Sequence, residues 1–146
     1  MKISLSWLSE YVDTSSGPEE IARRLTMAGL EVEGVTRGSE GLAGVVVAQI
    51  KEAAKHPNAD KLSLCLIDDG GVVKKVKRDA KGLVQVVCGA PNVAAGQLVA
   101  WIPPGVTVPS TYDKEPFVLE AREIRGKVSN GMIASLKELS LGDDHS

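Results

Sequence analysis

The chain is organised around two short runs of residues, His56-Pro57-Asn58-Ala59-Asp60-Lys61-Leu62 and Val87-Cys88-Gly89-Ala90-Pro91-Asn92-Val93. Both runs contain proline and asparagine, which restrict the backbone or bond to it in ways that favour turns. Between them, residues 62–67 alternate in the manner of a strand. We therefore predict two loops of special backbone chemistry on either side of strand-forming segments.

Further strands are predicted on both sides of this region, from β-branched and apolar runs that end in turn residues. They cover residues 45–50, 83–88, 98–102 and 117–124. Ser135 is placed to cap a short helix that continues through Leu139. Five or so strands with turns at regular intervals and one small helix favour a small closed β-barrel, and a β-sandwich is the main alternative.

A basic segment follows the turn Asp68-Asp69-Gly70-Gly71, whose residues accept the positive φ that hairpins need. The segment runs from Val72 to Val86 and contains Lys74, Lys75, Lys77, Arg78 and Lys81 around Gly82. The simplest prediction for it is a long exposed hairpin or loop.

The N-terminal part of the sequence predicts a small layer that contains both helix and strand. Ile3 and Leu5 alternate with polar residues and indicate a short strand. This strand is expected to enter a short helix with one apolar face, formed by Trp7, Leu8, Tyr11 and Val12. Ser16 and Glu19 match a capping box, which predicts a second helix that Gly29 can terminate. Residues 30–35 alternate as a strand. The expected arrangement is a strand-helix-strand layer.

The composition is that of a globular protein, with 43% apolar and 25% charged residues among 146. This length allows one domain, or one domain with a small attached layer and a linker at 37–41. No apolar run approaches the ~20 residues of a membrane span, and the first residues lack the continuous apolar core and the small-residue cleavage site expected of a signal peptide. We expect a cytoplasmic protein with no membrane partner. Cys65 and Cys88 lack metal-site spacing and are expected to be buried, reduced thiols.

Charge is unevenly distributed, although the net charge is only −2. Residues 1–41 carry 4 Lys/Arg against 7 Asp/Glu, residues 42–137 carry 13 against 9, and residues 138–146 carry three acids and no Lys/Arg. The centre is therefore basic between two acidic flanks. This asymmetry permits an anionic partner at the centre, and an ordinary solvated surface would also explain it.

The residues offer no credible active site. Adjacent acids in Asp68-Asp69 and Asp143-Asp144 point to opposite faces of an extended chain, so neither pair converges on one substrate atom. His56 precedes a proline that holds it in an extended conformation, and a structural turn is its expected role. Because no phosphate-binding glycine loop, nucleophile elbow or metal triad occurs in the sequence, we predict no catalytic residue, metal ligand or cofactor here.

Long cationic side chains near the predicted strand ends are the remaining candidates for binding. They suit a groove that follows an RNA phosphate backbone by shape and charge. The RNA-binding candidates are Lys51, Lys55, Lys61, Arg122, Arg125 and Lys127. Aromatic residues make up only 3% of the chain, so a base-stacking platform is weakly supported. From the residues alone, nucleic-acid contact and a plain protein-interaction role are equally open.

Three motifs in order resemble the tRNA-binding domain of bacterial synthetases and of freestanding tRNA-binding proteins. They are the two runs quoted above and Ile124-Arg125-Gly126-Lys127-Val128-Ser129-Asn130-Gly131-Met132-Ile133. The flanks are similar to the N-terminal region of the bacterial phenylalanyl-tRNA synthetase β subunit. This similarity lies in Lys2-Ile3-Ser4-Leu5-Ser6-Trp7-Leu8, Ala28-Gly29-Leu30-Glu31-Val32-Glu33 and the last nine residues. The resemblance covers essentially the whole chain.

The resemblance implies a mainly β fold, with residues 40–146 forming an OB-fold five-stranded barrel inserted in a small α/β N-terminal layer, residues 1–39. It implies a non-catalytic fragment of a longer subunit, with the layer completed beyond residue 146. In that family the parent is an α2β2 heterotetramer that attaches phenylalanine to its tRNA with ATP and magnesium, at a site in the α subunit. The expected partners are tRNA, the α subunit and the remaining β-subunit domains.

Individual positions of the motifs carry expected roles from the same resemblance. Lys61 and Arg125 are the better candidates for phosphate contact. The expected loop-shaping residues are Asn58, Asp60, Asn92, Ser129 and Met132. The chain departs from the family pattern at Ala134, where members commonly have cysteine, and in the basic 72–86 segment, which is longer than the usual compact hairpin. That second departure leaves open whether its lysines contact RNA or solvate a loop.

Two functions of different kinds are therefore expected. In the first, the barrel contacts tRNA weakly through the RNA backbone. In the second, the barrel and the N-terminal layer pack against other synthetase domains with little RNA contact. A freestanding dimeric tRNA-binding protein is disfavoured by the N-terminal layer.

Overall fold

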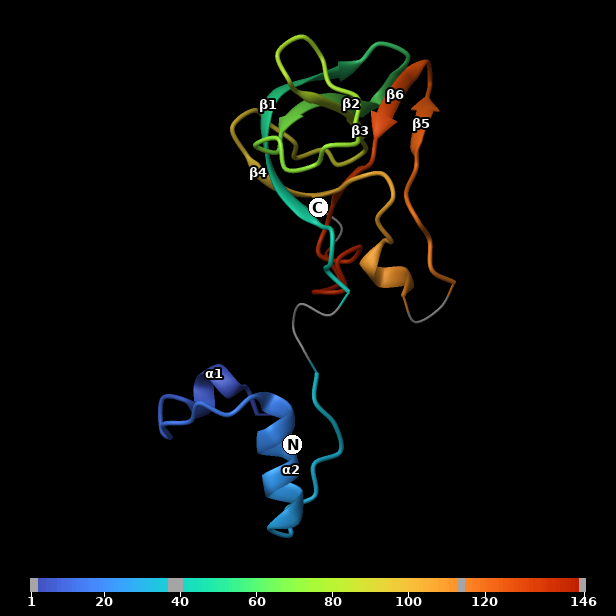
Figure 1. The fold of residues 1–146 in the computed structure, drawn as a ribbon. Coiled ribbons are helices and arrows are strands. Elements are labelled where there is room, and N and C mark those ends of the chain that lie inside the picture. The colour runs from blue at the N-terminus through green and yellow to red at the C-terminus, as the bar shows by residue number, and fades with distance from the viewer. Residues whose placement is uncertain (1–2, 37–40, 113–114, 145–146) are drawn as a thin grey trace. The chain divides into compact units, whose positions relative to one another are not determined.

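The fold is seen in a computed structural model, in which residues 3–36, 41–112 and 115–144 are described. The chain divides into two compact units, Met1–Glu40 and Gly41–Ser146. Figure 1 shows helices in the first unit and mainly strands in the second. Most of the linker expected at 37–41 lies outside the described residues.

The first unit contains two helices, α1 (Leu5–Leu8) and α2 (Pro18–Met27). The N-cap of α2 is Gly17, with no side-chain cap, so the capping box predicted at Ser16 is wrong. The backbone N–H of Ser16 instead bonds to the Thr14 hydroxyl at 3.2 Å. A proline at the first helical position makes a cap less necessary, because one of the free N–H groups is already absent. Within the described residues, no helix is long and apolar enough to span a membrane.

The strands predicted in this unit are not formed. The end of α2 is as expected, since the Leu30 N–H bonds to the Leu25 carbonyl at 2.9 Å around Gly29. Residues 30–36 are nevertheless unpaired with any strand, and residues 3–4 precede α1 directly. An alternating pattern produces a strand only where a neighbouring strand is available for hydrogen bonding, and none is described in this unit. Neither helix buries a residue.

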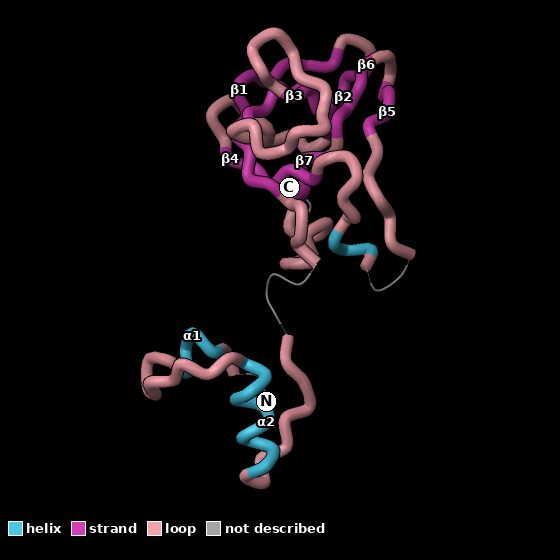
Figure 2. Tube along the Cα trace, viewed as in Figure 1, coloured by secondary structure: helices cyan, strands magenta, loops and turns pink. Residues whose placement is uncertain are grey.

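The second unit is built on a five-stranded antiparallel sheet in the order β3-β2-β1-β4-β7, with a separate β5-β6 hairpin. The mainly β class predicted from the sequence is confirmed. The strands are β1 (Val46–His56), β2 (Ala59–Asp68), β3 (Val84–Cys88), β4 (Leu98–Ile102), β5 (Ala121–Ile124), β6 (Lys127–Asn130) and β7 (Met132–Ala134), and a short 3₁₀ helix, η1, covers Pro109–Thr111. Figure 2 shows these strands curving around a common interior.

The β1–β2 hairpin forms the longest ladder of the sheet. Its register runs from Gln49 opposite Asp68 to His56 opposite Ala59, so the turn consists of Pro57 and Asn58. One shift of register falls between Ile50 and Glu52, which leaves an extra residue on β1. Such a bulge bends a strand and increases its twist.

The core lies between the strands of the second unit. Its largest fully buried side chains are Trp101, Ile50, Ile67, Ile102, Val84, Val86 and Cys65. Both cysteines are buried and free, as the sequence predicts. Burial raises the pKa of the Cys65 thiol to about 11, and the neighbouring Cys88 adds to the effect. The thiol therefore stays protonated at neutral pH.

Two predictions in the C-terminal third are wrong in extent. Of the strand predicted over 117–124, only β5 is a regular strand, and the preceding residues bond instead to residues 105–108. The helix predicted from Ser135 to Leu139 is a series of turns. Glu138 bonds to both the N–H and the hydroxyl of Ser135, so the local cap exists, but the segment is too short to propagate a helix.

Candidate nucleic-acid interface

The β1–β2 turn and the β5–β6 turn are fastened together by side chains of the first motif. The Asn58 side-chain amide donates to the Arg125 carbonyl at 3.0 Å. His56, which is buried, lies 3.2 Å from the Ile124 carbonyl through Nε2. The Asn58 N–H donates to His56 Nδ1 at 3.1 Å, which makes Nδ1 an acceptor and leaves the ring hydrogen on Nε2. With the hydrogen on Nε2, the His56 ring satisfies both partners and holds the β1–β2 turn against the β5–β6 turn.

The β5–β6 turn places an arginine in an unfavourable conformation. Arg125 has a φ of 52° and the following Gly126 a φ of 86°, the pair of positive values typical of a two-residue type I′ hairpin turn. The first position of this turn normally takes asparagine, aspartate or glycine, because other residues lose about 1 kcal/mol or more there. The arginine is exposed at this position. Retaining it costs stability, which points to a use for its side chain.

The predicted cations fall into two groups. Lys55 and Lys61 belong to the β1–β2 end, and Arg122, Arg125 and Lys127 to the β5–β6 hairpin. We call these five residues the hairpin-end surface; none of them makes an ion pair within the described part of the chain. Lys51 lies in the middle of β1, where its ammonium group bonds to Gln49 at 2.7 Å and lies 3.6 Å from the carboxylate of Asp68, the last residue of β2. The structure therefore does not bring Lys51 together with the other five.

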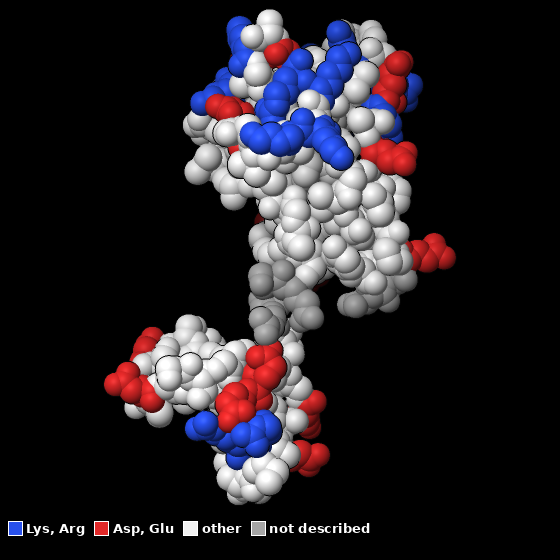
Figure 3. Space-filling view, viewed as in Figure 1, with Lys and Arg blue, Asp and Glu red and all other residues white. Residues whose placement is uncertain are grey.

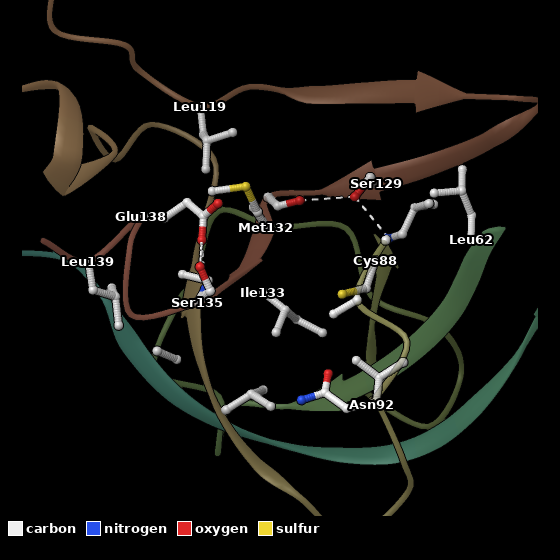
Figure 4. Close-up of a pocket in the computed structure, with 18 of the residues that line it drawn as sticks. Leu62, Cys88, Asn92, Leu119, Ser129, Met132, Ile133, Ser135, Glu138 and Leu139 are labelled. Carbon is white, nitrogen blue, oxygen red and sulfur yellow. Dashed lines mark hydrogen bonds between the residues drawn. The ribbon is translucent and has the colours of Figure 1, made fainter. Parts of the chain in front are cut away.

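The third motif fastens β6 to the edge strand β3. Ser129 is buried, and its hydroxyl accepts from the Val87 N–H and donates to the Gly131 carbonyl, both at 2.9 Å. Figure 4 shows Ser129 lying between the strand that carries Met132 and the residues next to Cys88. Ser129 thus acts as a bridge between the second and third motifs.

Replacing Ser129 with alanine tests that bridge. We expect Ser129→Ala to destabilise the chain by about 1–3 kcal/mol, because the Val87 N–H is left buried without an acceptor. Urea denaturation at pH 7 measures the change. Ser110→Ala is the matched control at a half-buried serine. Equal stability of the two variants would contradict the role given to Ser129.

Further bonds between distant segments involve Gln85, Asn130 and Trp101. The Gln85 side chain donates to the Val128 carbonyl at 2.8 Å, and the Asn130 side chain donates to the Gln85 carbonyl at 3.0 Å. The indole of buried Trp101 donates to the Asn130 carbonyl at 2.9 Å. Asn130 lies within the third motif, and the indole N–H of a buried tryptophan needs an acceptor, whereas nothing in the sequence indicates the role of Gln85.

A hollow of about 790 Å³ opens beside these bonds, and its lining includes three of the loop-shaping candidates, Asn92, Ser129 and Met132. Its lining is largely apolar, with Leu62, Leu119 and Ile133 among its members. The exposed Asn92 forms part of the wall, and its carbonyl accepts from Gln97 at 3.0 Å. The fifth loop-shaping candidate, Asp60, is exposed at the start of β2. Arg122 lines the same hollow and connects it to the hairpin-end surface.

The acid pair Asp68-Asp69 has structural partners. Asp68 accepts from the Gly70 N–H at 2.9 Å, and Asp69 is buried in an ion pair with Arg78 at 2.8 Å. The Arg78 guanidinium lowers the pKa of Asp69 to about 2, and the Val73 and Gly71 N–H groups add to this effect. An acid held in this way is a poor proton donor at neutral pH. No group of three His, Cys, Asp or Glu suited to a metal occurs in the described residues.

Residues 45–146 match the family described as "Putative tRNA binding domain". The chain is 47% identical to the phenylalanine–tRNA ligase β subunit of Salinibacter ruber, 44% to that of Rhodopseudomonas palustris and 42% to that of Bacillus subtilis. These matches cover 97–99% of this chain and 16–17% of the relatives. The resemblance found in the motifs is thereby confirmed, and the chain belongs to the tRNA-binding domain family.

Proposed function

We propose that this chain is the tRNA-binding module of a phenylalanine–tRNA ligase β subunit and that it contacts the RNA backbone through the hairpin-end surface. The observation that carries the proposal is the fastening of the β1–β2 turn to the β5–β6 turn by Asn58 and His56. This arrangement joins two hairpins whose cations make no ion pair within the described residues; four of these cations, Lys55, Lys61, Arg122 and Arg125, are exposed, and Lys127 is half-buried. Similarity to phenylalanine–tRNA ligase β subunits over nearly the whole chain supports the same role.

The available side chains favour contact with phosphates over stacking on bases. Trp101 is fully buried and bonded, so it cannot receive a base. Lysine and arginine at the hairpin ends meet phosphates without reading sequence, and such contacts make affinity strongly salt-dependent. The module therefore supplements recognition made elsewhere on the tRNA.

We infer that residues 40–146 form an OB-fold barrel and residues 1–39 a separate N-terminal segment. The bonds from β6 to β3 support closure, because they satisfy groups on an edge strand of the five-stranded sheet. A β-sandwich would instead have two sheets packed face to face over a core. The small β5-β6 hairpin fits better as the piece that closes a barrel.

The test is a double substitution on the hairpin-end surface, Lys61→Gln with Arg125→Asn. We expect tRNA affinity to fall about tenfold at low salt and the salt slope of binding to decrease by about 1.5–2, as for the loss of two phosphate contacts. Stability should change in the opposite direction, rising by about 0.5–1 kcal/mol, because asparagine tolerates the conformation of Arg125 better than arginine. Titration of a tRNA transcript at two salt concentrations, together with urea denaturation, measures both.

Charge-conserving substitutions provide the control. Lys61→Arg with Arg125→Lys should retain most of the affinity and the salt slope, since both positive charges remain. Opposite signs for binding and stability exclude unfolding as the cause of weaker binding. Wild-type affinity in the Gln/Asn variant would overturn the proposal.

The proposal for the whole protein extends beyond this chain. We propose that the parent is an α2β2 synthetase of the cytoplasm that charges tRNA with phenylalanine, using ATP and magnesium in the α subunit. The chain spans about one sixth of the length of the curated relatives it matches. The module's partners would then be tRNA, the α subunit and the rest of the β subunit.

A second function, packing against other synthetase domains, is favoured by the surface of the first unit. Trp7, Tyr11, Met27 and Leu30 are all more than half exposed there. Trp7 and Tyr11 form an edge-to-face pair with ring centroids 5.9 Å apart. Exposed apolar side chains of this size commonly belong to an interface. Protection of this region from hydrogen exchange on adding the remaining β subunit would support packing, and unchanged exchange would oppose it.

A further inference from the structure

The connection between β2 and β3, residues 69–83, is held by hydrogen bonds although it contains no helix or strand. The carboxylate of Asp69 is fully buried at its centre. It accepts two bonds from the Arg78 guanidinium, at 2.8 and 3.0 Å, and one each from the N–H groups of Gly71, at 3.1 Å, and Val73, at 2.9 Å. Both oxygens of the carboxylate are therefore satisfied by the loop itself.

The same loop is fixed by further hydrogen bonds and by packing on the core. The Arg78 guanidinium also donates to the carbonyls of Gly82, at 2.9 Å, and Val73, at 2.7 Å. Asp79 accepts from the N–H groups of Lys81 and Leu83, both at 2.8 Å. Val73 and Val76 pack on the main core. These contacts fix the backbone conformation of the loop although it contains no helix or strand.

The outer side of the loop carries an excess of positive charge. Residues 69–83 contain five Lys/Arg against two Asp. Arg78 is neutralised by Asp69, and Lys81 by Glu52 at 3.0 Å. The remaining lysines, Lys74, Lys75 and Lys77, are exposed and make no ion pair within the part of the chain that the structure describes. Figure 3 shows Lys and Arg side chains gathered on the face that carries this connection.

Three like charges within four residues repel one another. In a flexible segment they could spread apart, but here the buried ion pair and the two valines keep their backbone in place. A partner with closely spaced negative charges relieves the repulsion. A nucleic-acid backbone supplies such charges at regular intervals and without a requirement for sequence.

We propose that the β2–β3 loop is a second RNA-backbone contact surface, on which the Asp69–Arg78 pair holds Lys74, Lys75 and Lys77 in position for phosphates. This inference rests on the proposed function and adds a separate site to it. The loop begins at the end of β2 that is remote from Lys61, a separation of about 25 Å along an extended strand. One tRNA would thus be contacted at both ends of the β1–β2 hairpin.

The first test removes charge from the loop without disturbing its framework. Lys75→Gln with Lys77→Gln changes two side chains that make no hydrogen bond or ion pair in the described residues. We expect tRNA affinity to fall about tenfold at low salt and the salt slope to decrease by about 1.5–2. Arg23→Gln with Arg24→Gln gives the same change of net charge on α2 and should leave binding nearly unchanged. Wild-type affinity and slope in the lysine variant would overturn the inference.

The second test keeps every lysine and removes the framework. Asp69→Asn with Arg78→Gln leaves the net charge unaltered, so a loss of tRNA affinity reports the conformation of the loop. We expect a three- to tenfold loss, with faster hydrogen exchange confined to residues 70–83. Unchanged affinity in a loop shown to be loosened would overturn the positioning role of the ion pair.

Two further measurements separate this inference from its competitors. The fold-losses of tRNA affinity caused by the hairpin-end variant and by the loop variant should multiply in a protein that carries all four substitutions, because the two sites are distant. If the wild-type chain fails to bind tRNA, the proposed function itself fails; if only the hairpin-end variant weakens binding, the loop inference alone fails. Polyglutamate that competes as well as tRNA, with the same dependence on Lys75 and Lys77, would assign the loop to acidic proteins and overturn the RNA assignment.

Discussion

Gly131→Ala is expected to destabilise the second unit by about 3–5 kcal/mol, which is a large part of the total stability of a small domain. Gly131 has a φ of 85°, which an alanine adopts at a cost of about 1–2 kcal/mol. A Cβ atom there would also lie well inside contact distance of the Ile102 carbonyl oxygen, and 2.8 Å from Trp101 Nε1. Neither neighbour can move easily, since one is backbone and the other is a buried, hydrogen-bonded indole.

A second glycine separates the two causes of this loss. Gly105 has a nearly equal φ of 88°, and a Cβ atom there would have no neighbour within 4 Å. Gly105→Ala should therefore lose only the conformational part, about 1–2 kcal/mol. Urea denaturation of both variants at pH 7 gives the comparison. Equal losses would show that the close approach of Gly131 to Ile102 and Trp101 contributes nothing.

The sequence places Gly131 in a motif, but it does not show why a side chain is excluded at this position. Gly131 lies within the third motif, between the loop-shaping candidates Ser129 and Met132. The contact that excludes a side chain comes from Ile102, which lies in β4 and pairs with Met132. Local patterns predict turns and strand periodicity, whereas close approach between distant segments depends on tertiary packing.

The difference between local sequence pattern and tertiary packing also explains which of the other structural predictions were correct. The sequence has alternating or continuous apolar residues at 45–50, 62–67, 83–88 and 98–102, and this pattern predicted the four strands. The structure forms strands there because the core buries part of these apolar residues. The strand at 30–35 has the same pattern but no partner strand, and it is not formed. Bonds such as Gln85 to Val128 join residues more than forty positions apart, and no periodicity reports them. Arg125 stood out as a cation, while the strain of its backbone was visible only in the structure.

Asp69→Asn is the second substitution with a large expected effect, about 2–3 kcal/mol of stability at pH 7. The variant leaves the Arg78 guanidinium, whose side chain is only 23% exposed, without a counterion. Removing one partner of a buried ion pair is costly because the other charge stays desolvated. The double variant Asp69→Asn with Arg78→Gln should lose less than the single one, since no uncompensated charge remains. A double variant less stable than the single one would contradict this explanation.

The effect of Asp69 depends on pH with a defined sign. The Arg78 guanidinium lowers the pKa of this carboxyl from 3.8 to about 2 in the folded chain. A lowered pKa contributes stability that is fully present above about pH 4 and is lost as the pH falls through 2. A shift of this size corresponds to roughly 2 kcal/mol. The difference in unfolding free energy between wild type and Asp69→Asn should therefore shrink between pH 4 and pH 2.

The pH experiment needs a control for Glu20, because hydrogen bonds from Arg23 and Arg24 also lower the pKa of its carboxyl to about 2. Wild type alone would report both carboxylates in the same pH range. The difference between wild type and Asp69→Asn cancels Glu20, which both proteins contain, and Glu20→Gln provides the complementary comparison. Urea denaturation at pH 7, 4 and 2.5 is the measurement. A difference that stays constant from pH 7 to 2.5 would mean that the ionised Asp69 carboxylate does not hold the β2–β3 loop, and the ordered presentation of its lysines would lose its physical basis.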